Sequence, residues 1–299
     1  MNYKFVPKKE INIDKRFLYS FSFDNDVKGS LIFPLFVYQK ENNLILIDGF
    51  KRYQQFEYNF PVLQISDKEY SDDKAFIFSI NANLSFRKLN IIEKAKISML
   101  VSLYFNSTED EIIKILGIGK RDFHKLKDLL LLDESFKRKL AKWDFPKKNA
   151  LLMSDNPNNW NIIWNDLKSL NISASQFRKI LTVVNELSKR KRILPTKIWE
   201  DMKNQLKKHQ LKLDINSINL ILNIIQHPIS TKMEDIKKTI IKDLELPENI
   251  VFNFPVNFEG EYLDINLKIN SPKELKIIIE QLNKISDKKS FNKIFSDLL

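Results

Sequence analysis

The stretch LILIDGFKRY, residues 44–53, combines an apolar run with a glycine and two cations. The apolar run is typical of a buried strand, and Asp48-Gly49 then leads into a helix whose first turn carries Lys51 and Arg52. Amides at a helix start carry partial positive charge, glycine lets the backbone approach a ligand closely, and an arginine fork matches phosphate oxygens. The stretch therefore predicts an anion site, with a plain turn and two solvated cations as the alternative.

The segments around this stretch alternate between short strands and helices. Apolar runs typical of strands occupy residues 33–38 (FPLFVY), 43–48 (NLILID) and 61–65 (PVLQI). Ser71 and the two aspartates after it predict the start of a helix, which we expect to end near Asn83. Residues 1–90 therefore predict a small α/β domain.

The pattern from there to about residue 245 is helical almost throughout. Helix starts are predicted by capping boxes, in which a polar first residue and a Glu or Gln three residues later satisfy each other's amides. They occur at Asn90 with Glu93, Thr108 with Glu111, Ser173 with Gln176, and Thr231 with Glu234. The expected joints between helices are Pro146, Pro157 and Pro195, where the missing amide is tolerated.

The last part of the chain returns to strands. Residues 249–258 and 261–269 alternate in hydropathy around a Glu259-Gly260 turn, and Ser271-Pro272 opens a final amphipathic helix. We therefore predict the α+β class. The predicted domains are residues 1–90, a helical domain 91–195, a helical segment 196–245 and a ββα module 246–299.

Residues 107–132, STEDEIIKILGIGKRDFHKLKDLLLL, predict a helix-turn-helix with its turn at Gly117. The apolar positions expected to lock its helices together are Ile113, Leu116, Ile118, Phe123 and Leu126. The basic residues expected to face DNA are Lys120, Arg121, His124, Lys125 and Lys127. A plain helical hairpin is the alternative, because Ile113 stands where the motif usually has a small residue.

The composition favours a polyanionic partner. The 299 residues include 49 Lys and Arg against 38 Asp and Glu, a net charge of +11, which attracts nucleic acid through release of condensed counterions. AT-rich coding would also enrich lysine, so the charge alone does not decide. The basic run SKRKR at residues 188–192 is either a DNA contact or a solvated helix end.

The composition also excludes several classes of site. Without cysteine the chain has no disulfide, thiolate metal site or cysteine nucleophile. The three histidines, His124, His209 and His227, are far apart, so we expect no structural metal. The start of the chain lacks an apolar signal core and no run is long enough to cross a membrane, which predicts a cytoplasmic protein.

A second stretch, NANLSFRKLNIIEKAK at residues 81–96, gives the anion site its context. With LIDGFKR it resembles the N-terminal domain of the ParB partition-protein family. That family has a Pro-Leu-x-Val strand, a Gly-Glu-Arg-Arg box, and a Glu-Asn box leading into Leu-Asn-x-x-Glu-x-Ala. The segments that match are Pro34-Leu35-Phe36-Val37, Gly49-Phe50-Lys51-Arg52, and Ala82-Asn83 leading into Leu89-Asn90-Ile91-Ile92-Glu93-Lys94-Ala95. The resemblance covers about residues 30–150, and a helical DNA-binding domain follows the nucleotide domain in that family too.

The resemblance implies CTP as a ligand and Mg²⁺ as its ion. Ala82 replaces the Glu of the Glu-Asn box and removes an oxygen ligand for a hard cation, so we expect weak CTP hydrolysis at most. Phe86 stands where that box has its basic residue, and Arg87 follows it. The residues implied for the nucleotide site are Gly49, Lys51, Arg52, Asn83 and Arg87.

The function implied by the resemblance is that of a nucleoid-associated DNA-binding protein in chromosome or plasmid partition or in transcription regulation. Such a protein would form a homodimer and work with a partner ATPase. Relatives of this domain include small-molecule kinases, so a kinase with Asp48 or Glu93 as its base is one alternative. Sulfiredoxin activity is excluded because it needs a cysteine. A DNA adaptor with a non-functional nucleotide site is the other alternative.

Overall fold

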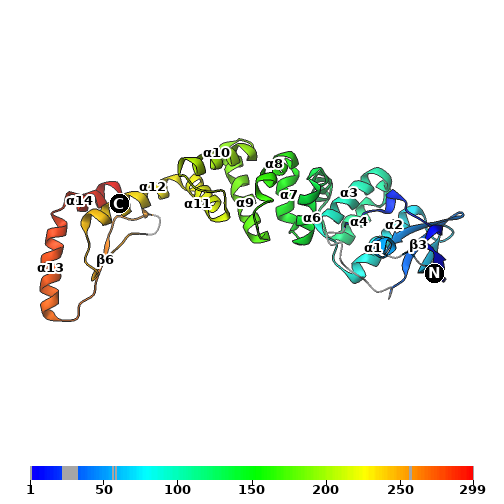
Figure 1. Ribbon diagram of the computed structural model, residues 1–299, viewed down its shortest axis with the longest axis horizontal. Helices are drawn as coiled ribbons and strands as arrows, with labels where there is room; N and C mark the ends of the chain where they lie inside the picture. The colour runs from blue at the N-terminus through cyan, green and yellow to red at the C-terminus, as the bar shows by residue number, and fades with distance from the viewer. Residues whose placement is uncertain (1, 22–32, 56, 58, 256–257, 299) are drawn as a thin grey trace. The chain divides into compact units, whose positions relative to one another are not determined.

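The structure is a computed structural model that describes residues 2–21, 33–55, 57, 59–255 and 258–298 (Figure 1). The chain divides into two compact units, Met1–Asn204 and Gln205–Leu299. The predicted α+β class is confirmed, with a mixed sheet, a mainly helical middle and a small hairpin with helices at the end. The finer division at residues 90, 195 and 245 stays a prediction. Among the described helices, none has the length and apolar character needed to cross a membrane.

A five-stranded sheet forms the first part of the first unit. Its strands are β1 (Asn2–Pro7), β2 (Ile11–Asn12), β3 (Leu35–Lys40), β4 (Asn43–Asp48) and β5 (Asn59–Ser66), and two short 3-10 helices follow β1 and β2, η1 (Lys8–Glu10) and η2 (Lys15–Phe17). The order across the sheet is β1-β5-β3-β4-β2. The central strand β3 runs antiparallel to β4 and parallel to β5. These three are the predicted strands, whereas β1 and β2 form through long-range pairing with β5 and β4.

Two helices that follow these strands carry the site residues. Helix α1 (Phe50–Gln55) follows β4 directly, and α2 (Asp72–Phe86) contacts β4. The Ser71 side chain accepts a hydrogen bond from the Lys74 amide and caps α2 as predicted. The predicted end of α2 near Asn83 is wrong, since the helix continues to Phe86. Asn83 does not cap the helix, because its side chain is buried in hydrogen bonds to other elements.

Helices make up the rest of the first unit. They are α3 (Ile91–Tyr104), η3 (Asn106–Thr108), α4 (Glu109–Leu116), α5 (Lys120–Leu126), η4 (Lys127–Leu131), α6 (Glu134–Lys142), α7 (Lys147–Ser154), α8 (Pro157–Leu167), α9 (Ala174–Lys191) and α10 (Pro195–Lys208), which continues past the division. The capping boxes at Asn90 and Ser173 are confirmed. The box at Thr108 is wrong, because the Thr108 hydroxyl donates to the Phe105 carbonyl instead, at 2.8 Å. Pro146 caps α7, while Pro157 and Pro195 are the first residues of α8 and α10.

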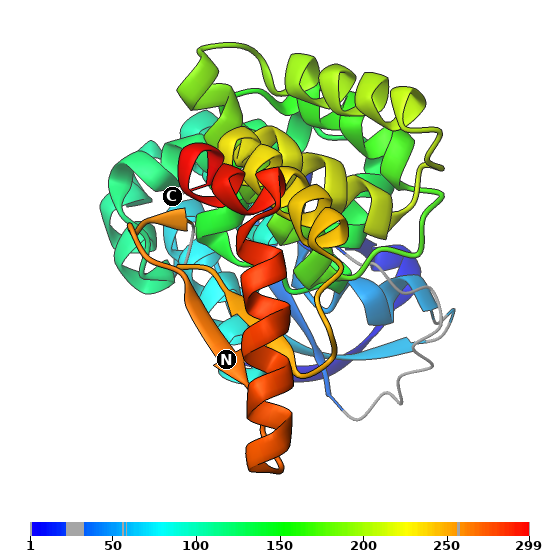
Figure 2. The ribbon, with the colours of Figure 1, turned by 90° about the vertical axis from the view of Figure 1, so that its left-hand side faces the viewer.

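The second unit packs helices on a two-stranded sheet. Its further elements are α11 (Ile215–Gln226), α12 (Pro228–Leu244), β6 (Ile250–Asn253), β7 (Asp264–Leu267), α13 (Pro272–Ser286) and α14 (Lys289–Asp297). Helix α13 lies beside the β6–β7 hairpin in Figures 1 and 2, and Ile278 shares a core with Phe252. The capping box predicted at Thr231 is wrong, because Pro228 already begins α12 and the Thr231 hydroxyl donates to the His227 carbonyl. The strands are shorter than predicted, and a second helix, α14, follows the expected final one.

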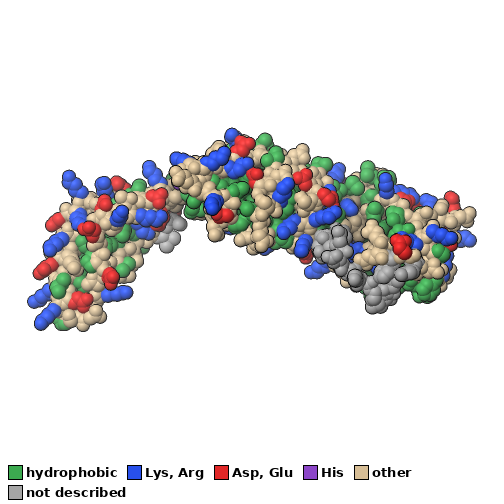
Figure 3. Space-filling view, viewed as in Figure 1, with side chains coloured by type: hydrophobic (Ala, Val, Ile, Leu, Met, Phe, Trp, Pro, Cys, Tyr) green, Lys and Arg blue, Asp and Glu red, His purple; other side chains and the backbone are tan. Residues whose placement is uncertain are grey.

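Some apolar side chains of the second unit are exposed to solvent. They include Ile265 on β7 and Ile277 and Ile279 on α13. On the face that Figure 3 shows, apolar side chains of this unit lie among Lys and Arg side chains. The homodimer expected from sequence stays a prediction, and light scattering that finds only a monomer would exclude it.

Candidate functional site

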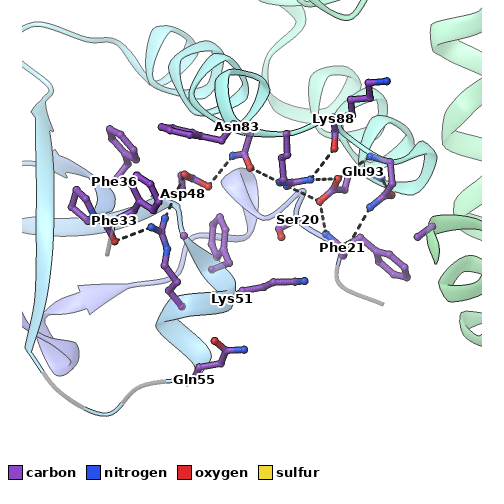
Figure 4. Close-up of a pocket in the computed structure, with 18 of the residues that line it drawn as sticks. Ser20, Phe21, Phe33, Phe36, Asp48, Lys51, Gln55, Asn83, Lys88 and Glu93 are labelled. Carbon is purple, nitrogen blue, oxygen red and sulfur yellow. Dashed lines mark hydrogen bonds and ion pairs between the residues drawn. The ribbon is translucent and has the colours of Figure 1, made fainter. Parts of the chain in front are cut away.

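A cavity of about 650 Å³ in the first unit is lined by residues from the sheet, from α2 and from the end of α6. All five residues predicted for the nucleotide site line it: Gly49, Lys51, Arg52, Asn83 and Arg87 (Figure 4). Two motifs that are separate in the sequence therefore meet at one surface. The volume lies within the range of small-molecule sites in proteins.

Gly49 sets the position of Arg52 at this cavity. Its φ is +93°, and a Cβ on it would lie 2.6 Å from the Leu35 side chain and 2.9 Å from Arg52 Nη2, so the site requires a glycine. Arg52 Nη1 donates to the Phe33 carbonyl at 2.8 Å, and Nη2 lies 3.9 Å from Asp48 Oδ2. Burial lowers the pKa of Arg52. The negative charge of Asp48 opposes that shift, and the arginine stays charged at neutral pH.

Helix α1 has only six residues, which limits how much its backbone amides contribute to the anion site predicted at Gly49. The helix macrodipole grows from many aligned peptides, and so short a helix provides few of them. The positive field at the cavity therefore comes mainly from side chains. Its lining includes five cations against three carboxylates, a local net charge of +2; the cations are Lys51, Arg52, Arg87, Lys88 and Lys142, and the carboxylates are Asp48, Glu93 and Asp144.

Asn83 connects β4 to α2 through its buried side-chain amide. Its Nδ2 lies 2.7 Å from the Tyr19 hydroxyl, 2.8 Å from Asp48 Oδ1 and 3.1 Å from the Ser79 carbonyl. Burial raises the pKa of Tyr19, which keeps the hydroxyl protonated, and this hydroxyl donates to the Ser79 carbonyl. Asn83 is thus engaged with the protein and holds Asp48 in place at the cavity.

Arg87 forms a two-pronged ion pair with Glu93. Its Nη1 and Nη2 donate to the two carboxylate oxygens at 2.7 and 2.9 Å, and its Nε donates to Asn83 Oδ1 at 3.2 Å. The Glu93 side chain is only 2% exposed and also accepts hydrogen bonds from the amides of Asn90 and Phe21. Burial works to lower the pKa of Arg87, but the bonds to Glu93 outweigh it and hold that pKa above its usual value.

The cavity provides few ligands for a metal ion. Within the described residues, no group of three or more His, Asp or Glu side chains is placed to hold one. Ala82, which stands where the sequence resemblance has a Glu, is half-buried on α2 and does not line the cavity. The excess of lysine and arginine over carboxylates in its lining suits the cavity to an anion.

The predicted helix-turn-helix corresponds to α4 and α5, with Gly117 between them in the left-handed region at φ +61°. The buried apolar residues here are Ile112, Ile118, Phe123 and Leu126. The choice of Ile113 as a core position is wrong, since Ile112 is fully buried and Ile113 only partly. The buried face of α4 is shifted by one residue from the predicted one, which accounts for this difference.

The five predicted DNA-facing cations differ in their partners. Lys120 pairs with Glu109 and Asp110, and His124 Nε2 lies 3.3 Å from the same Glu109 carboxylate. Lys125 pairs with Asp155. Arg121 and Lys127 are exposed, and no ion pair to either occurs within the described part of the chain. A DNA contact through all five stays a prediction.

No protein-family model matches the sequence, and no curated protein matches it. Two solved structures, both of the C-terminally truncated chromosome-partitioning protein ParB from Caulobacter crescentus, are similar. The one complexed with CTP-gamma-S is 13% identical with a TM-score of 0.22, over 55% of this chain and 97% of that chain. The one complexed to the centromeric parS site is 14% identical with a TM-score of 0.33, over 60% of this chain and 98% of that chain. Part of this chain is similar to ParB.

Sequence patterns did not reveal two of the site's features. Glu93 was expected to cap a helix or to act as a kinase base, and its pairing with Arg87 was not expected, because that pair spans a helix break and follows no standard spacing. Phe33 and Phe86 were not expected to lie together, yet their ring centroids are 5.6 Å apart. Both contacts depend on the tertiary path of the chain.

Proposed function

We propose that the cavity binds a nucleoside triphosphate, with Lys51 and Arg52 on its phosphates, and that α4 and α5 bind DNA. CTP is the nucleotide implied by the sequence resemblance. The observation that carries the proposal is the meeting of both predicted motifs at one cavity of about 650 Å³ with an excess of positive charge. Such a protein would work in DNA partition or transcription regulation.

The cations of the cavity support this proposal to different degrees. Arg87 has its donors directed at Glu93 and Asn83, which favours a role in holding the site together. Arg52 uses Nη1 on a backbone carbonyl, while its Nη2 lies 3.9 Å from Asp48, beyond hydrogen-bond range. Arg52 therefore keeps donors for a phosphate, and the exposed Lys51 adjoins it.

Calorimetric titration of the full chain with CTP, ATP and inorganic triphosphate, with and without Mg²⁺, tests the nucleotide site. Because a charge-assisted hydrogen bond is worth about 1.5–3 kcal/mol, Lys51→Ala and Arg52→Ala should each weaken binding by roughly tenfold or more. Lys4→Ala, an exposed lysine on β1, is the matched control and should bind as the unaltered protein does. Unaltered protein that binds none of these ligands, or two variants that bind normally, would refute the site.

The DNA-binding part of the proposal rests on charge and on exposed cations of α5 and of η4, which follows it directly. The chain carries a net charge of +11, and Arg121 and Lys127 are open to solvent. Contacts of this kind to phosphates make binding depend strongly on salt concentration.

A kinase at the same cavity is the second candidate. It would need a carboxylate base, and both oxygens of Glu93 are engaged by Arg87 and backbone amides. Asp48 is the better candidate, since its Oδ1 accepts from Asn83 and its Oδ2 faces Arg52. Transfer of the γ-phosphoryl group of ATP to the hydroxyl of an added small acceptor, with release of ADP, would favour the kinase. A DNA adaptor with a non-functional nucleotide site would bind DNA and no nucleotide.

A further inference from the structure

Two exposed phenylalanines stand together on the wall of the cavity. Phe86, the last residue of α2, is 67% exposed, and Phe33, just before β3, is 55% exposed. Both line the cavity, and their ring centroids lie 5.6 Å apart at an interplanar angle of 52°. Their exposure contrasts with that of Phe50, a neighbouring lining residue whose side chain belongs to the buried core.

The exposure of these two rings has no explanation in the packing of the first unit. A single exposed apolar side chain is common at protein surfaces, but a pair of aromatic rings at a cavity with fixed cations is the usual composition of a ligand site. Phe86 is also the position at which the sequence resemblance expects a basic residue. The site therefore has a ring where a phosphate contact was expected.

One of the cations is bonded to the segment that carries one of the rings. Arg52 donates to the backbone carbonyl of Phe33, so the guanidinium and the Phe33 ring are fixed to the same segment. Figure 4 shows Phe33 beside Phe36 at one end of the cavity, with Lys51 reaching into it from α1. A ligand with its phosphates at Lys51 and Arg52 has aromatic side chains within the same cavity for the rest of its structure.

We propose that Phe33 and Phe86 form a platform on which the base of the bound nucleotide stacks. This inference rests on the proposed nucleotide site and adds the part of the ligand that the cations do not recognise. Every nucleobase has a π-face, so stacking on such a platform strengthens binding without selecting one base strictly. The ligand class is thus a nucleotide with a planar aromatic base, as opposed to a free polyphosphate or a sugar phosphate.

Titration of the full chain with CTP, ATP, ribose 5-triphosphate and inorganic triphosphate distinguishes the contribution of the base to the binding affinity from that of the phosphates. The unaltered protein should bind the two nucleotides about five- to a hundredfold more tightly than the two ligands without a base. Phe86→Ala should remove most of that difference and leave the affinity for inorganic triphosphate unchanged. Phe86→Trp keeps a ring and should retain the preference for nucleotides.

Phe5→Ala is the matched control, since Phe5 lies on β1, is 65% exposed and does not line the cavity. Equal binding of nucleotides and inorganic triphosphate by the unaltered protein would overturn the platform and leave the phosphate site standing. Equal loss of all four ligands in Phe86→Ala would also overturn it. Absence of binding by the unaltered protein to any of the four would remove both the platform and the proposed function.

Discussion

The cavity and the α4–α5 surface both pair cations with carboxylates, but they do so under different conditions. At the cavity, Arg87 meets a Glu93 side chain that is 2% exposed, whereas on α5 the Lys120 side chain is 62% exposed. Water screens the second pair, whereas in the first it reaches Arg87 but not the buried Glu93 carboxylate, where an unpaired charge would be costly. The first pair therefore stabilises the site itself. In the second pair, Lys120 can leave its carboxylate partners and bind another anion.

The largest effect is expected from breaking the ion pair of Arg87 with the buried Glu93 carboxylate. Arg87→Ala leaves the Glu93 carboxylate without its ion pair, which for a fully buried pair costs about 3–5 kcal/mol of unfolding free energy. The Arg87 side chain is 40% exposed, so we expect roughly 2–3 kcal/mol, measured by urea unfolding.

Arg178→Ala, which removes an exposed arginine of α9, is the control for Arg87→Ala and should change the stability little. Adding Glu93→Gln to Arg87→Ala should restore part of the lost stability, because the uncompensated charge is then gone. An Arg87→Ala protein as stable as the unaltered chain would show that the pair is screened like a surface pair.

An intermediate effect is expected at the exposed cations of α5 and of η4, which follows it. Arg121→Ala and Lys127→Ala should each weaken binding to duplex DNA about tenfold at 50 mM salt and lower the slope of log affinity against log salt by about 0.9. Fluorescence anisotropy over a series of salt concentrations measures both quantities. Lys179→Ala, on α9, is the control, and a slope equal to that of the unaltered protein in both variants would exclude this face from DNA contact.

The smallest effect is expected from removing the carboxylate that Lys120 and His124 share. Glu109→Gln abolishes a negative charge beside α5, so DNA affinity should rise about two- to threefold while the thermal midpoint moves by no more than about 2 °C. Glu111→Gln, on the same helix, is the control because no ion pair to Glu111 occurs in the described part of the chain. A large drop in the thermal midpoint of Glu109→Gln would mean that the exposed pair is as important for stability as the buried one.

Local signals predicted much of the fold. Strands β3, β4 and β5 and the helix starts at Ser71, Asn90 and Ser173 follow from apolar runs and capping residues that act within a few positions. β1 and β2 were missed because they are defined by partners far along the chain. The errors at Thr108 and Thr231 share one cause, since each hydroxyl bonds a carbonyl earlier in the chain in place of a helix-start amide.

The residues named from the sequence line one cavity, and their role in binding stays a prediction. Gly49 with Arg52 and Asn83 with Arg87 do line one cavity, which their motifs led us to expect. The engagement of Arg87 by Glu93 depends on side-chain burial that no spacing reveals. The same holds for the pairing of Phe33 with Phe86, since each ring is placed by a different element.

The close packing around Gly49 has a practical consequence for mutagenesis. Any side chain there would push at once on Leu35, which belongs to the hydrophobic core, and on Arg52, which faces the cavity. A library of substitutions at this position would therefore mix misfolding with loss of ligand contacts, and survival in a genetic screen would not tell the two apart. Lys51, whose exposed side chain projects from the first turn of α1, is the better position at which to read ligand recognition separately from folding.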